Sequence, residues 1–145
     1  MAKQVSTRAG GELSVRLNSV VIHLMRRMRR VDDRQPVGRA RLSALSVLVF
    51  GGARTMSQLA IDEGVTPATI HHVVQGLLDE GLAQKTGDPA DRRKSVIEVS
   101  AKGRRLMLKA RGARLAMLDE WLSTLSAADR DTIMRAVAIL SRWSL

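Results

Sequence analysis

Apolar residues near the start of the chain recur at spacings of three and four, which is typical of one face of an α-helix. This first segment runs from Glu12 to about Val31 and ends at the polar, proline-containing stretch 32–36. A second predicted helix spans about Ala40 to Phe50, where a pair of glycines ends it. Residues 1–11 are polar and lack this pattern, so we expect a loose basic arm there.

Two shorter helices follow, and residue types that favour helix caps mark their boundaries. Thr55 is a suitable N-cap, with Gln58 three residues later as in a capping box. Thr66 and Pro67 have the N-cap and first-turn types for the next helix, which we expect to reach about Glu80. Only the short segment 64–66 separates the two helices. This spacing predicts a helix-turn-helix.

Two β-prone runs, at residues 82–86 and 95–100, follow the helix-turn-helix. The stretch between them, from Asp88 to Lys94, combines turn-forming residues with three consecutive cations. A hairpin with a basic tip, placed directly after a recognition helix, is typical of a winged DNA-binding domain. The reason is that one long cation can enter a narrow minor groove while the helix occupies the adjacent major groove.

The rest of the chain predicts two more helices, one from Ser100 to Leu125 and one from Ser126 to about Trp143. The predicted fold is therefore mainly α with a small β-hairpin wing, a winged helix-turn-helix with flanking dimerisation helices. We divide the chain into a flexible N-terminal arm (1–11), an N-terminal dimerisation helix (12–36), the winged helix-turn-helix DNA-binding domain (37–100) and C-terminal dimerisation helices (101–145).

The charge of the chain favours a polyanionic partner. Its 145 residues contain 24 Lys and Arg against 14 Asp and Glu, a formal net charge of +10. This excess favours DNA, RNA or an anionic membrane surface, although a solvated basic protein without such a partner has the same charge. The chain has no cysteine and no apolar run of the ~20 residues that a membrane span needs. Because its N-terminus also lacks a signal-peptide pattern, we expect a cytoplasmic, nucleoid-associated protein with no membrane partner.

The segment from Thr55 to Gly103 resembles the MarR family of winged helix-turn-helix transcription regulators. Four pieces carry the resemblance in order, namely Met56-Ser57-Gln58-Leu59-Ala60, Val65-Thr66-Pro67-Ala68-Thr69-Ile70, Gly81-Leu82, and Asp88-Pro89-Ala90-Asp91-Arg92-Arg93 with Val99-Ser100-Ala101-Lys102-Gly103. The resemblance implies a homodimer, held by the N-terminal helix and the last two helices, that binds a pseudopalindromic operator in double-stranded DNA. It also implies a small aromatic or phenolic effector that loosens DNA binding.

The helix predicted from Thr66 to Glu80 has two different faces. At about 100° per residue, its large apolar residues fall on the side that packs on the domain. On the other side, Gln75 is suited to a bidentate contact with adenine, Ala68 to a thymine methyl, and the threonines to phosphate or a thymine edge. The candidate DNA contacts of the two short helices are Ser57, Gln58, Thr66, Ala68, Thr69, His71, His72 and Gln75. The alternative for each is an ordinary solvated helix face.

The chain departs from the family pattern at His72 and Gly76, where members often carry arginine. The resemblance therefore implies weaker phosphate anchoring by this helix and a larger share for the wing. The imidazoles of His71 and His72 lead to the further hypothesis that DNA affinity rises as the pH falls toward about 6.

On the wing, we expect Arg93 to enter the minor groove and Asp91 to accept its hydrogen bonds and fix its direction. Arg92, Lys94 and Lys85 are interpreted as phosphate contacts. The alternative is a solvated hairpin loop.

The apolar stripes of the terminal helices are interpreted as a dimer interface, because a compact monomer of this length does not need so many. The alternative is that they form the core of a monomer. The residues expected in the interface are Leu13, Leu17, Val20, Leu24, Met117, Trp121, Leu125, Ile133, Val137 and Leu140. The family resemblance places an effector site between these helices and the winged domain, with His23, Arg27 and Met28 as candidates. Two alternatives stay open, an ordinary interface role for His23 and a regulator with weak or no ligand response.

The sequence offers no catalytic or metal-binding arrangement. His71 and His72 are adjacent on a helix and point about 100° apart, so they do not chelate one metal ion, and His23 is far away in sequence. We therefore expect a non-enzyme without cofactors that acts as a dimeric, sequence-specific transcriptional repressor. Two alternatives stay open, a nearly sequence-independent architectural DNA-binding protein and a basic helical adaptor that binds protein or RNA.

Overall fold

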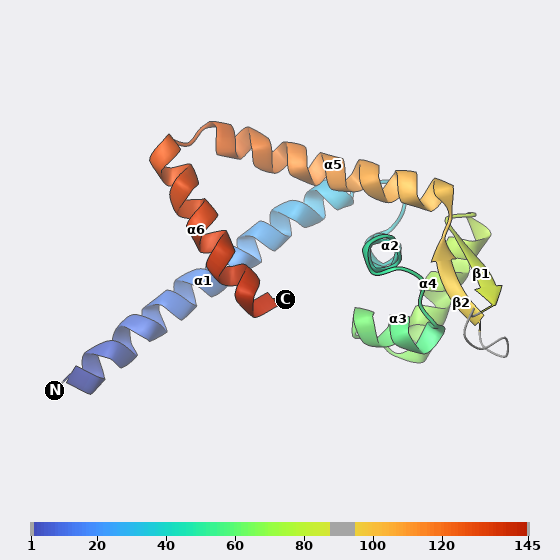
Figure 1. Ribbon diagram of the computed structural model, residues 1–145, viewed down its shortest axis with the longest axis horizontal. Coiled ribbons are helices and arrows are strands. Elements are labelled where there is room, and N and C mark those ends of the chain that lie inside the picture. Colours follow the sequence, from blue (N-terminus) through green and yellow to red (C-terminus); the bar gives the residue numbers. More distant parts are fainter. Residues whose placement is uncertain (1, 88–94, 145) are drawn as a thin grey trace. The chain divides into compact units, whose positions relative to one another are not determined.

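The computed structural model describes residues 2–87 and 95–144, and this part of the chain contains six helices and one antiparallel two-stranded sheet (Figure 1). This architecture confirms the predicted mainly α fold with a small hairpin. The elements are α1 (Ala2–Asp32), α2 (Arg39–Gly51), α3 (Met56–Glu63), α4 (Pro67–Asp79), β1 (Ala83–Gly87), β2 (Ser95–Val99), α5 (Ala101–Ser123) and α6 (Ala127–Ser144). The chain divides into two compact units, 1–110 and 111–145, and the division falls within α5.

The hydrophobic core of the first unit lies among α2, α3, α4, the hairpin and the beginning of α5. Its largest fully buried side chains are Leu45, Leu48, Leu59, Ile70, Val74, Leu77, Leu82, Ile97 and Met107. Burying each such side chain stabilises the fold by roughly 1.5–3 kcal/mol. The second helix of the helix-turn-helix is thus fixed by a core to which every neighbouring element contributes.

The hairpin is joined to the helices by a third extended segment, which the sequence analysis did not predict. Strands β1 and β2 pair in a register that sets Ala83 opposite Val99 and Gly87 opposite Ser95. The backbone of Arg54, just before α3, then pairs with Ile97 through hydrogen bonds of 3.1 and 2.7 Å. Because Ile97 is also buried in the core, the base of the wing is anchored to the helix-turn-helix.

The beginning of α5 packs against the end of α4. The hydroxyl of Ser100 accepts a hydrogen bond from the Gly103 amide at 3.0 Å and donates one to the Gly81 carbonyl at 2.7 Å. Lys102 donates to the Glu80 carbonyl at 2.7 Å. These contacts satisfy groups at both helix ends, and they confirm Ser100 as the N-cap of the long helix.

Two helix boundaries differ from the prediction. Helix α1 begins at Ala2 and not at Glu12, so the segment assigned to a loose arm is helical. Glycine costs only about 1 kcal/mol in a helix interior and so does not by itself end a helix. Helix α5 ends at Ser123, two residues before the predicted Leu125, and there the Thr124 hydroxyl donates to the Trp121 carbonyl at 2.7 Å. Such side-chain hydrogen bonds to nearby backbone groups compete with the backbone hydrogen bonds that would continue the helix.

The second unit contains the end of α5 and helix α6. Ser126 caps α6 as predicted, since its hydroxyl accepts a hydrogen bond from the Asp129 amide at 3.1 Å. Among the helices in the described part of the chain, none is long and apolar enough to cross a membrane.

Candidate nucleic-acid interface

The first helix of the helix-turn-helix, α3, begins with a complete capping box. The Thr55 hydroxyl accepts a hydrogen bond from the Gln58 amide at 3.3 Å, and the Gln58 side-chain oxygen accepts one from the Thr55 amide at 2.9 Å. The predicted cap is confirmed. It also means that the side-chain oxygen of Gln58 is engaged within the protein, although Gln58, like Ser57 beside it, is exposed.

The turn between the two helices depends on Gly64, which ends α3 with φ 63° in the left-handed region. That conformation is unfavourable for residues with a Cβ, so glycine is the suitable residue here. Thr66 then caps α4 by accepting a hydrogen bond from the Thr69 amide at 3.2 Å, and the two hydroxyls lie 2.9 Å apart. Both threonines remain exposed at the first turn of α4.

Helix α4 has the two faces that the sequence predicts. Its apolar residues Ile70, Val73, Val74 and Leu77 are all buried. The predicted DNA-facing residues Ala68, Thr69, His71, His72 and Gln75 are all exposed. The Gln75 amide nitrogen donates one of its two hydrogens to the Asp79 carboxylate at 2.8 Å, which leaves its second N–H and its carbonyl oxygen for a contact with a base.

On the wing, Lys85 is exposed on β1, opposite the buried Ile97 of β2. The predicted minor-groove residue Arg93 and its neighbours Asp91, Arg92 and Lys94 lie outside the described residues. The strands that are described form the base of the wing, and β1 begins shortly after α4 ends.

Arg54 holds these elements together, and sequence reasoning missed it. Its guanidinium pairs with Asp62 of α3 at 2.9 Å and donates to the carbonyl of Ala53 at 3.1 Å and to that of Gly51, at the end of α2. Because its backbone is also hydrogen-bonded to Ile97 of β2, Arg54 connects α2, α3 and the wing. No local sequence pattern marks this role, because the partners are brought together only by the fold.

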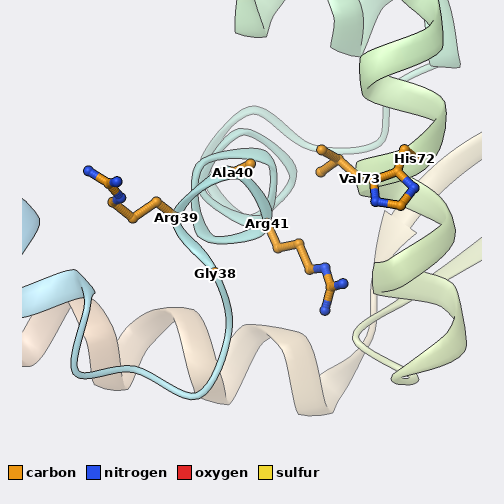
Figure 2. A pocket seen from close by; sticks show the side chains of 6 residues that line it. All are labelled: Gly38, Arg39, Ala40, Arg41, His72 and Val73. Atoms are coloured by element: carbon orange, nitrogen blue, oxygen red, sulfur yellow. The ribbon is translucent and has the colours of Figure 1, made fainter.

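A second missed residue, Arg41, extends from α2 toward α4 (Figure 2). It pairs with Glu80, which follows α4 directly, and it lies against Gly76 in the middle of α4. The sequence does mark Gly76 as unusual, because MarR family members often carry arginine there. It does not reveal that the side chain of Arg41 lies where a side chain at position 76 would otherwise be.

The residues predicted at the dimer interface are exposed or half-buried within a single chain. On α1, Leu13 and Val20 are 66% and 61% exposed, and Leu17 and Leu24 each 39%. Of the residues from α5 onward, Trp121, Val137 and Leu140 are exposed and Met117, Leu125 and Ile133 are half-buried. The described part of α6 also exposes apolar side chains that the sequence analysis did not select, namely Met134, Ile139 and Trp143.

The three candidate effector residues lie on α1, where His23 and Arg27 are exposed and Met28 is half-buried. None of them lines the concavity beside α2 that Figure 2 shows. Among the described residues, no three His, Asp or Glu side chains are grouped to hold a metal ion.

Comparisons with known proteins agree with this geometry. No family model matches the chain. The chain is 38% identical over 124 residues to an uncharacterized HTH-type transcriptional regulator of Mycobacterium bovis, and the match covers 86% of each chain. In structure it is similar to a MarR family protein from Bacillus stearothermophilus, with a TM-score of 0.83, 21% identity and coverage of 94% and 96% of the two chains. A putative transcriptional regulator from Pseudomonas aeruginosa is 27% identical, with a TM-score of 0.78 and coverage of 92% and 94%.

Proposed function

The chain belongs to the HTH-type transcriptional regulators and has the fold of the MarR family, and we propose that it binds a specific operator in double-stranded DNA as a homodimer. The observation that carries this proposal is the division of α4 into a wholly buried apolar face and an exposed polar face. An exposed face of this kind, on the second helix of a helix-turn-helix, is suited to contact base edges in a major groove.

The DNA contacts proposed for each half-site come from three places. Ser57 stands at the beginning of α3, where backbone amides favour phosphate. The exposed residues of α4 meet the bases, and the wing meets the flanking minor groove through Arg93 and the phosphates through its other cations, including Lys85. The net charge of +10 supports such a complex, because the attraction to phosphates supplies much of the affinity.

The homodimer is proposed because the terminal helices expose too much apolar surface for an isolated chain. Leu13 and Val20 on α1 and Val137, Ile139 and Trp143 on α6 are each more than half exposed. Large exposed apolar surface marks interaction sites on proteins in solution. A second copy is the proposed occupant, since a two-fold dimer sets two recognition helices about 10 bp apart on a two-fold symmetric operator.

The proposed biological role is repression at the nucleoid in the cytoplasm, with release by a small aromatic or phenolic effector. His23, Arg27 and Met28 are the residues proposed to meet that effector. This part of the proposal rests on the resemblance to the MarR family.

A nuclease footprint of the purified protein on DNA upstream of its own gene tests the proposal, with Arg93→Ala as the paired variant. We expect a protected, two-fold symmetric site of roughly 20 bp that the substitution weakens. Diffuse protection that ignores sequence would favour an architectural DNA-binding protein. A preference for RNA over duplex DNA, with no effect of the substitution, would favour a basic adaptor.

A further inference from the structure

Helix α4 contains no lysine or arginine between Pro67 and Asp79, although its exposed face is the one proposed to meet DNA. A cation nevertheless occupies the surface of this helix. A Cβ atom built on Gly76 would lie 2.6 Å from Nε of Arg41 and 2.8 Å from its Cζ. These distances are too short for real contacts, so the guanidinium of an α2 residue fills the space that a side chain at position 76 would need.

The position of Arg41 is fixed by Glu80, the residue directly after α4. Its guanidinium pairs with Glu80, one turn after Gly76, and about a third of the Arg41 side chain remains exposed. An arginine that gives one edge of its guanidinium to a carboxylate still has donors for a second anion, because the group carries five N–H donors. Glycine at 76 and the acid at 80 therefore fix the direction of an exposed cation.

Arg41 also faces an open concavity of about 600 Å³ between α2 and α4 (Figure 2). His72, which is one turn before Gly76 on the same face of α4, lines this concavity, and so does Arg39. No carboxylate is among its lining residues in the described part of the chain. A concavity lined by cationic and imidazole side chains attracts anions, and arginine suits the geometry of a phosphate group.

We propose that Arg41, together with His72, binds a phosphate of the DNA backbone, and that Gly76 and Glu80 position Arg41 for this contact. An arginine from α2 thereby supplies the phosphate anchor that α4 lacks in its own sequence. The inference rests on the proposed DNA-binding function and adds Arg41, a contact outside both the recognition helix and the wing.

The first test measures the affinity of the full chain for its footprinted duplex at several salt concentrations, by fluorescence anisotropy. Arg41→Gln should weaken binding about tenfold and lower the slope of log K against log salt by about one per half-site. Arg16→Gln is the matched control, since Arg16 is also an exposed, ion-paired arginine, bonded to Glu12 at 2.6 Å, but does not line the concavity. We expect it to lose much less affinity than Arg41→Gln. Equal losses, or no loss in Arg41→Gln, would overturn the inference.

The second variant, Gly76→Ala, displaces the guanidinium without removing any charge. Alanine favours a helix over glycine, so the variant should be at least as stable as the wild type. We expect Gly76→Ala to weaken DNA binding in the wild-type background and to have no further effect when Arg41 is already glutamine. Additive losses in this double-mutant cycle, or an unchanged affinity of Gly76→Ala, would contradict the proposed positioning.

The wild-type protein separates the inference from the function on which it rests. A wild type that fails to bind duplex DNA overturns both. A wild type that binds its operator while Arg41→Gln binds equally well overturns the phosphate contact alone.

Discussion

The close packing of α5 against Leu82, the residue before β1, predicts a large loss of stability for Gly103→Ala. Gly103 is buried in the first turn of α5, and a Cβ there would collide with the backbone carbonyl of Leu82 and lie 3.1 Å from Cδ2 of Leu45. A backbone carbonyl has no rotamer by which to move aside. Overpacking of this kind costs about 1–3 kcal/mol, and we expect the upper end of that range. The gain in helix propensity offsets at most about 1 kcal/mol, which leaves a net loss near 2 kcal/mol.

Gly112→Ala is the matched control, because it makes the same substitution on the same helix where a Cβ meets nothing within 4 Å. It should stabilise the protein by up to about 1 kcal/mol. Both variants and the wild type are compared by urea denaturation at one protomer concentration, since association shifts apparent stability. The packing argument is refuted if Gly103→Ala is as stable as Gly112→Ala.

Three further predictions concern the cap of α4, the dimer and the histidines. Thr66→Ala removes the acceptor for the Thr69 amide and should lower the free energy of unfolding by about 1 kcal/mol; an unchanged urea midpoint would show that the cap adds nothing. Val137→Asp places a charge among the exposed apolar residues of α6 and should convert a dimer to a monomer in sedimentation equilibrium; a variant that associates as tightly as the wild type argues against an interface at this position. Replacing both His71 and His72 with glutamine should weaken operator binding, because both side chains lie on the exposed face of α4 proposed to meet DNA; an affinity equal to that of the wild type in fluorescence anisotropy would exclude them from the interface.

The features that the sequence predicted correctly depend on residues close together in the chain. The caps at Thr55, Thr66 and Ser126 each bond to a residue three positions later, and the buried face of α4 follows from the helical period alone. Such short-range signals survive folding because the partners are neighbours before the chain folds.

The features that the sequence did not predict depend on residues far apart in the chain. The pairing of Arg54 with Ile97 and the placement of Arg41 against Gly76 exist only once the core has formed. The beginning of α1 at Ala2 was missed for a different reason, since the polar residues of this segment lack an apolar period although they allow a helix. The missed contacts are thus the ones that join separate elements, and Arg41 is the one that extends the candidate DNA interface.

The central claim, that this chain reads a particular DNA sequence, is tested most directly by a specificity ratio. The affinity of the wild type for the footprinted duplex is compared with its affinity for a scrambled duplex of equal length and composition, at one physiological salt concentration. A specific regulator should bind the first duplex at roughly 10⁻⁸–10⁻¹¹ M and at least about 10³-fold more tightly than the second. A ratio near one would contradict the account, because the contacts would then be made to the DNA backbone alone.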